Sequence, residues 1–396
     1  MKKYISLAVA ATIAFTACNK DDDSDNSGQS NSLKNHKEQT IDAYAGLVYA
    51  TYQEAYNKAV EMESAIDAFV SNPTSSTQQS AKDAWLAARE PYGLTEAFRF
   101  GDGPIDDEDG PEGLLNAWPL DEGYIDYTEM DLTSGIINDP TNYPTISEDL
   151  LESLNEEGGE ENVSVGFHAI EFLLWGQDLN PGGDYSNAGQ RSYNDYVSGS
   201  GATNVDRRKA YLAACASLVV EHLNDMVNEW APNANNYRAD FVADDVDVSL
   251  AKIMKGISIL SKGELAGERI YVAVDNQDQE DEHSCFSDNT HRDIITNAQG
   301  IRNVFFCQNT DLSYSGYSLF NMIAGEDADL AQEISDLVEG SVDMAENMHI
   351  PFDEALTQAA SRDELLELVA NLQQQGDKLV EAGAEVGITI SADLPD

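Results

Sequence analysis

The chain has 396 residues and a strongly acidic composition, with 72 Asp and Glu against 22 Lys and Arg and a formal net charge of −50. This charge excludes nucleic acid as a partner, because phosphates would be repelled, and it attracts cations. Solubility in salty surroundings accounts for most of the charge, so only a few carboxylates are expected to belong to a site.

The N-terminus is predicted to be a lipoprotein signal peptide over residues 1–17. A short basic start is followed by about a dozen apolar residues, which suits a signal peptide and is too short to span a membrane. Small residues precede Cys18, as a lipoprotein signal peptidase requires, so Cys18 is the predicted lipidation site. The alternative is an ordinary cleaved signal peptide with an incidental cysteine. We expect a cell-envelope protein held on the outer membrane by a lipid anchor only, on its periplasmic or its exposed face.

Residues 18–34 are expected to form a disordered acidic tether, because the segment after Cys18 is polar and offers nothing to bury. Three further cysteines follow in the body of the chain: Cys215, Cys285 and Cys307. The predicted compartment permits disulfides, and Cys285 with Cys307 is a candidate pair.

Apolar residues recur at three- and four-residue steps through most of the body, which predicts an all-α protein. We expect two consecutive, mutually similar helical bundles of the four-helix type, over residues 35–238 and 239–396. The residues between 101 and 144 are rich in Gly, Pro and Asp and predict a long irregular segment. The predicted helices span 41–70, 76–100, 147–155, 161–176, 204–230, 246–275, 291–306, 326–348 and 361–387.

The most informative motif is Gly166-Phe167-His168-Ala169-Ile170-Glu171. On a helix, His168 and Glu171 lie on one face, where an imidazole and a carboxylate can hold one metal ion. The alternative is a hydrogen bond between the two side chains inside an apolar core, where a polar pair must find partners. Two ligands do not complete a metal site, so further donors must come from elsewhere.

A second group of candidate ligands precedes the helix predicted at 291–306. It combines two imidazoles, a thiol and carboxylates, all of which can bind metals, and its members are Glu282, His283, Cys285, Asp288 and His291. The alternative is a polar loop that caps the following helix. Glu96 and Arg99 in the first half, and Glu268 and Arg269 in the second, each stand in an apolar stretch before an acidic loop, which weakly indicates an internal repeat.

The Gly166-x-His168-x-x-Glu171 motif matches the GxHxxE signature of imelysin-like proteins, and the segment from His283 to His291 resembles the iron-regulated, cyanobacterial-type branch of that family. The resemblance implies two similar helical bundles with the signature near their interface, in envelope proteins associated with bacterial iron uptake. It carries His168 and Glu171 over as the signature pair. The candidates for the surroundings of this pair are Glu96, Arg99, Glu268, Arg269 and His283.

The favoured hypothesis is therefore an envelope lipoprotein that binds iron or an iron complex near the interface of the bundles. Its expected cofactor is iron or another divalent metal, and its candidate partners are envelope iron-transport components. The family's name derives from a peptidase, so a metallopeptidase is the first alternative. A zinc peptidase needs three protein ligands, and Phe172 stands where an HxxEH motif has its second histidine. A scaffold lipoprotein without a ligand is the second alternative.

Overall fold

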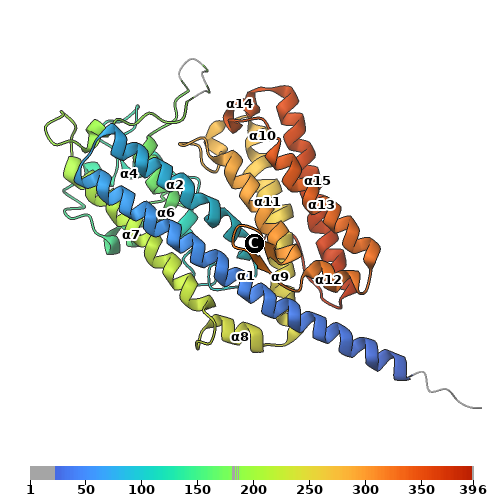
Figure 1. The fold of residues 1–396 in the computed structure, drawn as a ribbon. Helices are drawn as coiled ribbons and strands as arrows, with labels where there is room; N and C mark the ends of the chain where they lie inside the picture. The colour runs from blue at the N-terminus through green and yellow to red at the C-terminus, as the bar shows by residue number, and fades with distance from the viewer. Residues whose placement is uncertain (1–22, 181–182, 184, 186, 395–396) are drawn as a thin grey trace, which may run out of the picture.

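The computed structural model describes residues 23–180, 183, 185 and 187–394, and helices dominate these ranges (Figure 1). The expected all-helical fold is confirmed. Strand structure within the same ranges is limited to β1 (Gln308–Asn309) and β2 (Tyr314–Ser315), an antiparallel pair with Gln308 opposite Ser315. The predicted signal peptide and Cys18 lie outside the described residues.

The first group of helices consists of α1 (Asp23–Ser71), α2 (Ser75–Thr95), α6 (Gly166–Trp175) and α7 (Val205–Trp230), with α1 packed on α2 and α7. A short turn joins α1 to α2, and Thr74 caps α2 by accepting the Thr77 N–H at 3.1 Å. The helix therefore begins one residue before the predicted start at residue 76.

The expectation of a disordered tether is wrong for residues 23–34, because α1 already begins at Asp23. Once a helix has nucleated, each added residue gains a hydrogen bond at a small entropic cost, and no proline interrupts this segment. Figure 1 shows the start of α1 projecting away from the other helices.

The second group is built on one continuous helical run, α9 (Val246–Ile259), η4 (Leu260–Tyr271) and α10 (Val272–Asn276), packed with α11 (Thr290–Phe306), α13 (Ala328–Glu346) and α15 (Ala359–Glu385). The segment η4 is a wide helix with i→i+5 hydrogen bonds, as in the bond from Val272 N–H to the Gly267 carbonyl. Wide turns of this kind often mark functional sites, because they shift which side chains face inward.

Shorter elements cover the ends and faces of these two groups. They are η1 (Glu96–Phe98), α3 (Glu112–Asn116), α4 (Glu122–Ile125), η2 (Ile136–Asn138), α5 (Glu148–Leu154), η3 (Tyr193–Tyr196), α8 (Tyr237–Ala243), η5 (Gln279–Asp281), α12 (Leu319–Ala324) and α14 (Phe352–Thr357). The segment expected to be irregular thus holds short helical turns with loops between them.

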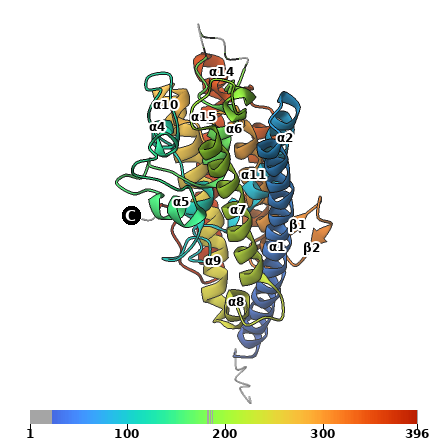
Figure 2. The ribbon, with the colours of Figure 1, turned by 90° about the vertical axis from the view of Figure 1, so that its left-hand side faces the viewer.

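The two groups share one contiguous apolar core. Helix α11 packs on α2 from the first group and on α13 from the second, so it forms the junction between them. Figure 2 shows the long helices of both groups running along a common direction. The boundary expected near residue 238 falls within α8, which connects α7 to α9.

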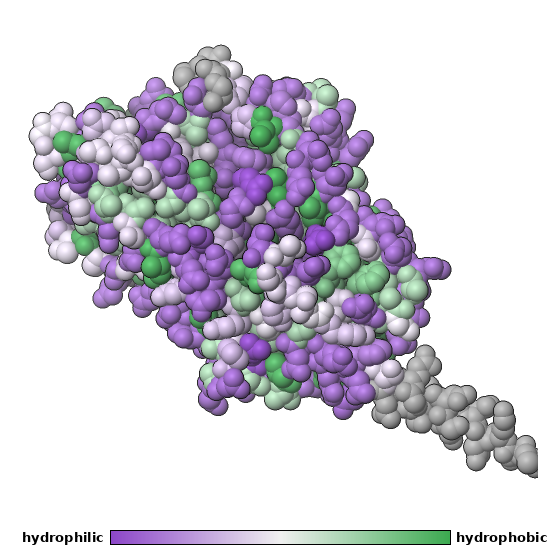
Figure 3. Space-filling model, viewed as in Figure 1, coloured by the Kyte–Doolittle hydropathy of each residue, from purple (hydrophilic) through white to green (hydrophobic). Residues whose placement is uncertain are grey.

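The surface matches the acidic composition. In Figure 3 hydrophilic residues cover most of the visible face, and apolar residues are scattered among them. Within the described residues, every helix is too short or too polar to cross a membrane.

Candidate functional site

The glycine of the motif is required by the backbone. Gly166 has φ of +88°, a left-handed conformation that favours glycine, and it is the first residue of α6. A Cβ atom at this position would lie 2.7 Å from the Leu115 carbonyl oxygen of α3. On the same turn, the Trp85 indole N–H donates to the Phe167 carbonyl at 2.9 Å and fixes α6 against α2. Gly166 therefore sets the position from which His168 and Glu171 enter the core.

The signature pair is buried and internally hydrogen-bonded. His168 Nδ1 lies 2.9 Å from Glu171 Oε2, and Glu171 Oε1 accepts the Ser287 backbone N–H at 2.9 Å and its hydroxyl at 2.6 Å. Burial raises the pKa of Glu171 to about 8 and lowers the pKa of His168 to about 3. At neutral pH both groups are therefore uncharged, and the Glu171 carboxyl donates its proton toward Nδ1. The other ring nitrogen, His168 Nε2, is buried without a hydrogen-bond partner.

A second imidazole lies beside this pair. The rings of His168 and His283 have centroids 4.8 Å apart, and Trp118 stands edge-on to His283 at 5.0 Å. Burial, and then the charge of Arg269, lower the pKa of His283 to about 3, so this ring is also neutral. Its Nδ1 donates to Asp293 Oδ2 at 3.1 Å, and its Nε2 accepts a long bond of 3.4 Å from the Asn116 amide.

Asp293 is the ionised carboxylate of this cluster. Burial opposes its charge, but the charge of Arg89 and the bonds from His283 and Ser284 outweigh burial and hold its pKa well below the usual range. Arg89 donates to Asp293 Oδ1 from Nη2 at 2.8 Å and to Asn116 Oδ1 from Nη1 at 2.5 Å. Asp293 therefore orients His283 and fixes its tautomer.

A network of arginines and carboxylates adjoins the imidazoles. Arg269 donates to Glu96 Oε2 at 2.5 Å, to Glu264 Oε1 at 2.9 Å and to Asn297 Oδ1 at 2.7 Å. Burial disfavours the Glu96 anion, but Arg269 and Arg99 more than compensate and lower its pKa to about 2. Because Asn116 Nδ2 lies 3.5 Å from Glu96 Oε1 and 3.4 Å from His283 Nε2, this network continues into the imidazole cluster.

Comparison with known proteins identifies the family of this chain. The sequence model of the imelysin family, peptidase M75, matches residues 48–379. The chain belongs to the imelysin family. A curated relative, iron-regulated protein A of Synechococcus elongatus, is 24% identical over 318 residues, which cover 78% of this chain and 71% of the relative.

Two solved structures share the imelysin fold. One, from Parabacteroides distasonis, is described as an iron-regulated protein A precursor; it has a TM-score of 0.70 and 17% identity and covers 88% of this chain and 95% of its own. The other is an imelysin-like protein from Psychrobacter arcticum, with a TM-score of 0.63 and 13% identity over 90% of this chain and 98% of its own.

Two expectations about this imelysin site are wrong. Glu268 is exposed, whereas Glu264, which the sequence analysis missed, bonds to Arg269. In the wide helix the residue five positions before Arg269 lies on its face, which places Glu264 beside it. Glu268 directly precedes Arg269 in the chain, and neighbouring residues of a helix point in different directions. Cys285 and Cys307 are both free thiols, so the candidate disulfide between them is not formed.

The other candidate ligands between residues 281 and 293 lie near the start of α11 or beside a separate group of aspartates. His291 bonds through Nδ1 to the Asp288 carbonyl at 3.0 Å, beside the start of α11. Asp288 joins two other aspartates, Asp178 and Asp353, whose carboxylate oxygens lie within 4.8 Å of one another. Burial, and then the charge of Asp353, raise the pKa of Glu282. His283 packs edge-on against His168 of the signature pair, and the pKa of the Cys285 thiol is raised by burial and then by the charge of Glu171.

The sequence gives no reason to place Arg89, Asn116 or Glu264 in the site, and it offers Asp293 only as one carboxylate of the 281–293 segment. Arg89 and Asp293 are charged residues within predicted helices, and a buried charge demands a partner. The need of a buried charge for a partner is a signal that could have identified both residues as part of an ionic network. Nothing in the sequence pairs them, because Arg89 and Asp293 are 204 positions apart.

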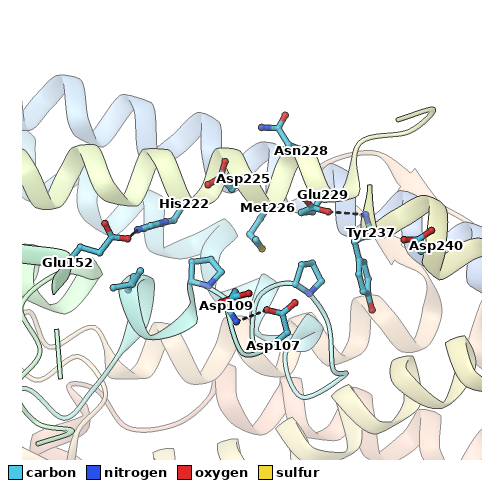
Figure 4. Close-up of a pocket in the computed structure, with 13 residues that line it drawn as sticks. Asp107, Asp109, Glu152, His222, Asp225, Met226, Asn228, Glu229, Tyr237 and Asp240 are labelled. Carbon is cyan, nitrogen blue, oxygen red and sulfur yellow. Dashed lines mark hydrogen bonds and ion pairs between the residues drawn. The ribbon is translucent and has the colours of Figure 1, made fainter. Parts of the chain in front are cut away.

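The imidazole cluster is closed, and an open acidic cleft lies elsewhere in this imelysin chain. The cleft has a volume of about 660 Å³ between α7 and the loop before α3 (Figure 4). His222 lies 3.6 Å from Glu152 at one end, and Glu229 accepts the Tyr237 N–H at the other. None of the signature residues lines it.

Proposed function

We propose that this imelysin-family chain binds iron in a bacterial cell envelope, through His168 Nε2 and His283 Nε2. The observation that carries the proposal is the buried, unpartnered Nε2 of a neutral His168 beside a second neutral imidazole. Neutral imidazole is a good ligand for divalent first-row metals, and a carboxylate on the other ring nitrogen is the usual arrangement behind a metal-bound histidine. Here Glu171 and Asp293 take that role.

In this proposal Glu171 orients the His168 ring through its hydrogen bond to Nδ1 and does not bind the metal itself, whereas the sequence predicts it as a ligand. Metal at His168 Nε2 would stabilise the Nδ1–H tautomer and the Glu171 carboxylate, so binding would release a proton. Two protein ligands do not fill a coordination sphere, and the other positions would be taken by water or by the iron complex's own ligands. Access requires the loop that carries Ser287 to move, since this residue closes over Glu171.

The peptidase alternative is weakened by the same burial. His168 is 2% exposed and Glu171 is fully buried, so an extended peptide has no route to them in this conformation. Incubation with an unfolded protein and Zn²⁺ tests it: cleavage that Glu171→Gln abolishes would favour the peptidase over the binding protein.

The iron proposal is tested by titrating Fe²⁺, without oxygen, into the purified protein in competition with a chromogenic chelator. We expect one bound metal, loss of binding in His168→Ala and His283→Ala, and weakening by about 10- to 100-fold in Glu171→Gln. His349→Ala is the control, because His349 pairs with Glu354 outside the cluster. Equal binding by the parent and both cluster variants would refute the proposal.

The envelope location and the lipid anchor at Cys18 also belong to this proposal, as do partners among envelope iron-transport components. Labelling of cells with a radioactive fatty acid should mark the parent protein and leave a Cys18→Ser variant unmarked. Equal labelling of the two proteins would refute the anchor.

A further inference from the structure

A group of carboxylates outside the imidazole cluster is assembled from three distant segments. Asp178 follows α6, Asp288 precedes α11, and Asp353 lies in α14. One carboxylate oxygen from each lies within 4.8 Å of the others. Oxygens about 2.4 Å from a common Ca²⁺ ion can be at most about 4.8 Å apart, so the spacing fits one ion.

This acidic group has no cationic partner in the described part of the chain. Its three carboxylates form none of the ion pairs found there with Lys, Arg or His. Burial, and after it the repulsion between these carboxylates, raises the pKa of Asp178 to about 6 and that of Asp288 to about 8. Burial and the charge of Glu354 also raise the pKa of Asp353. These carboxylates therefore repel one another unless a proton or a cation neutralises part of their charge.

Asn180 supplies a second, independent observation. Its side chain is 8% exposed, and its Oδ1 is buried without a hydrogen-bond partner. Its Nδ2 lies 2.8 Å from Asp178 Oδ2, 2.9 Å from Asp353 Oδ2 and 2.6 Å from Gln279 Oε1. An amide nitrogen has only two hydrogens, so it cannot satisfy three acceptors. Asn180 Nδ2 is thus surrounded by three acceptor oxygens, a position that a cation could also occupy.

Glu282 supplies another unpartnered oxygen. Its side chain is 4% exposed, and its Oε1 has no hydrogen-bond partner. The charges that act on its carboxylate include those of Asp353, Asp288 and Asp178. Two buried oxygens without partners thus adjoin three convergent carboxylates.

We propose that Asp178, Asp288 and Asp353 bind a Ca²⁺ ion. A flipped Asn180 amide and the Glu282 carboxylate would add two oxygens. An oxygen-only set selects a hard cation over the metals that favour imidazole or thiolate. Ca²⁺ accepts many ligands in irregular geometry, whereas Mg²⁺ demands a near-regular octahedron and retains several waters.

The ion would connect both helix groups at the end of the molecule where α10 and α14 lie (Figure 1). Asp288 directly follows Ser287, the residue that bonds twice to Glu171. Calcium would therefore fasten the loop that closes over the signature pair, without being a ligand of that pair. The calcium site is independent of iron binding, so each can fail without the other.

Thermal unfolding of the purified chain, freed of metals with a chelator and then supplied with CaCl₂, tests the inference. Ligand bound only to the folded state raises the melting temperature. We expect Ca²⁺ to raise that of the parent and of His168→Ala, and Mg²⁺ at the same concentration to raise it much less. Asp353→Asn should be at least as stable as the parent in chelator, because repulsion is relieved, yet should lose the calcium response.

Calorimetric titration of CaCl₂ gives the affinity. We expect one ion per chain in the parent and about tenfold or greater weakening in Asp288→Asn and Asp353→Asn, since affinity follows the number of charged ligands. Asp363→Asn is the matched control, an exposed aspartate of α15, and should bind as the parent does. No calcium response in the parent, or an equal response in Asp353→Asn, would overturn the inference.

Discussion

The charge of Glu96 should be a large contributor to the stability of the junction between the helix groups. Glu96→Gln keeps the shape of the side chain and its acceptor for Asn116 but removes the charge opposite Arg269. Arg269 is fully buried and would keep only Glu264 as an anionic partner. Removing one partner of a buried ion pair leaves an uncompensated charge, which costs about 3–5 kcal/mol.

The pKa of Glu96 gives an independent magnitude. The difference between the ordinary value of 4.5 and about 2 in the folded protein corresponds to about 3 kcal/mol. Because the folded pKa is depressed, this stabilisation is complete above about pH 4.5 and is lost as the pH falls toward 2. The difference between the parent and Glu96→Gln should therefore shrink over that range.

Urea unfolding monitored by tryptophan fluorescence and circular dichroism measures both effects. Glu268→Gln is the matched control, because Glu268 is exposed on the same run of helix that carries Arg269. We expect its unfolding free energy to change by less than about 0.5 kcal/mol. If Glu96→Gln and Glu268→Gln unfold at the same urea concentration at pH 7, the assignment of Glu96 to a buried ionic network is refuted.

Three further predictions concern other parts of the chain. Asp126 is buried between Arg191 and Arg208, so Asp126→Asn should lower the unfolding free energy by about 3 kcal/mol in urea; no change would contradict the pairing. Gly166→Ala should lower it by about 1–3 kcal/mol, because of the positive φ and the clash with Leu115, and should weaken Fe²⁺ binding; parental behaviour in thermal unfolding and chelator competition would argue against this role. Alkylation of the unfolded chain without reductant should modify both Cys285 and Cys307, as mass spectrometry can show, whereas a protected pair would indicate a disulfide.

The sequence by itself determined the helices and the signature pair. Helical periodicity and helix breakers act over a few residues, which is why α7, α11 and α13 lie where the pattern predicts them. The spacing of His168 and Glu171 likewise required their contact on one helix face, and their hydrogen bond is present. Local spacing could not reveal whether that face is open or buried.

Tertiary structure decided the partners. Arg89 meets Asp293 and Asn180 meets Asp353 across more than 170 positions of sequence, and such pairings depend on how helices pack. The wide helix η4 places Glu264 beside Arg269, because its hydrogen bonds join residues five apart, whereas an α-helix would place Leu265 there. Helix positions follow from local propensity, whereas the buried charges are paired by contacts that form only when distant segments meet.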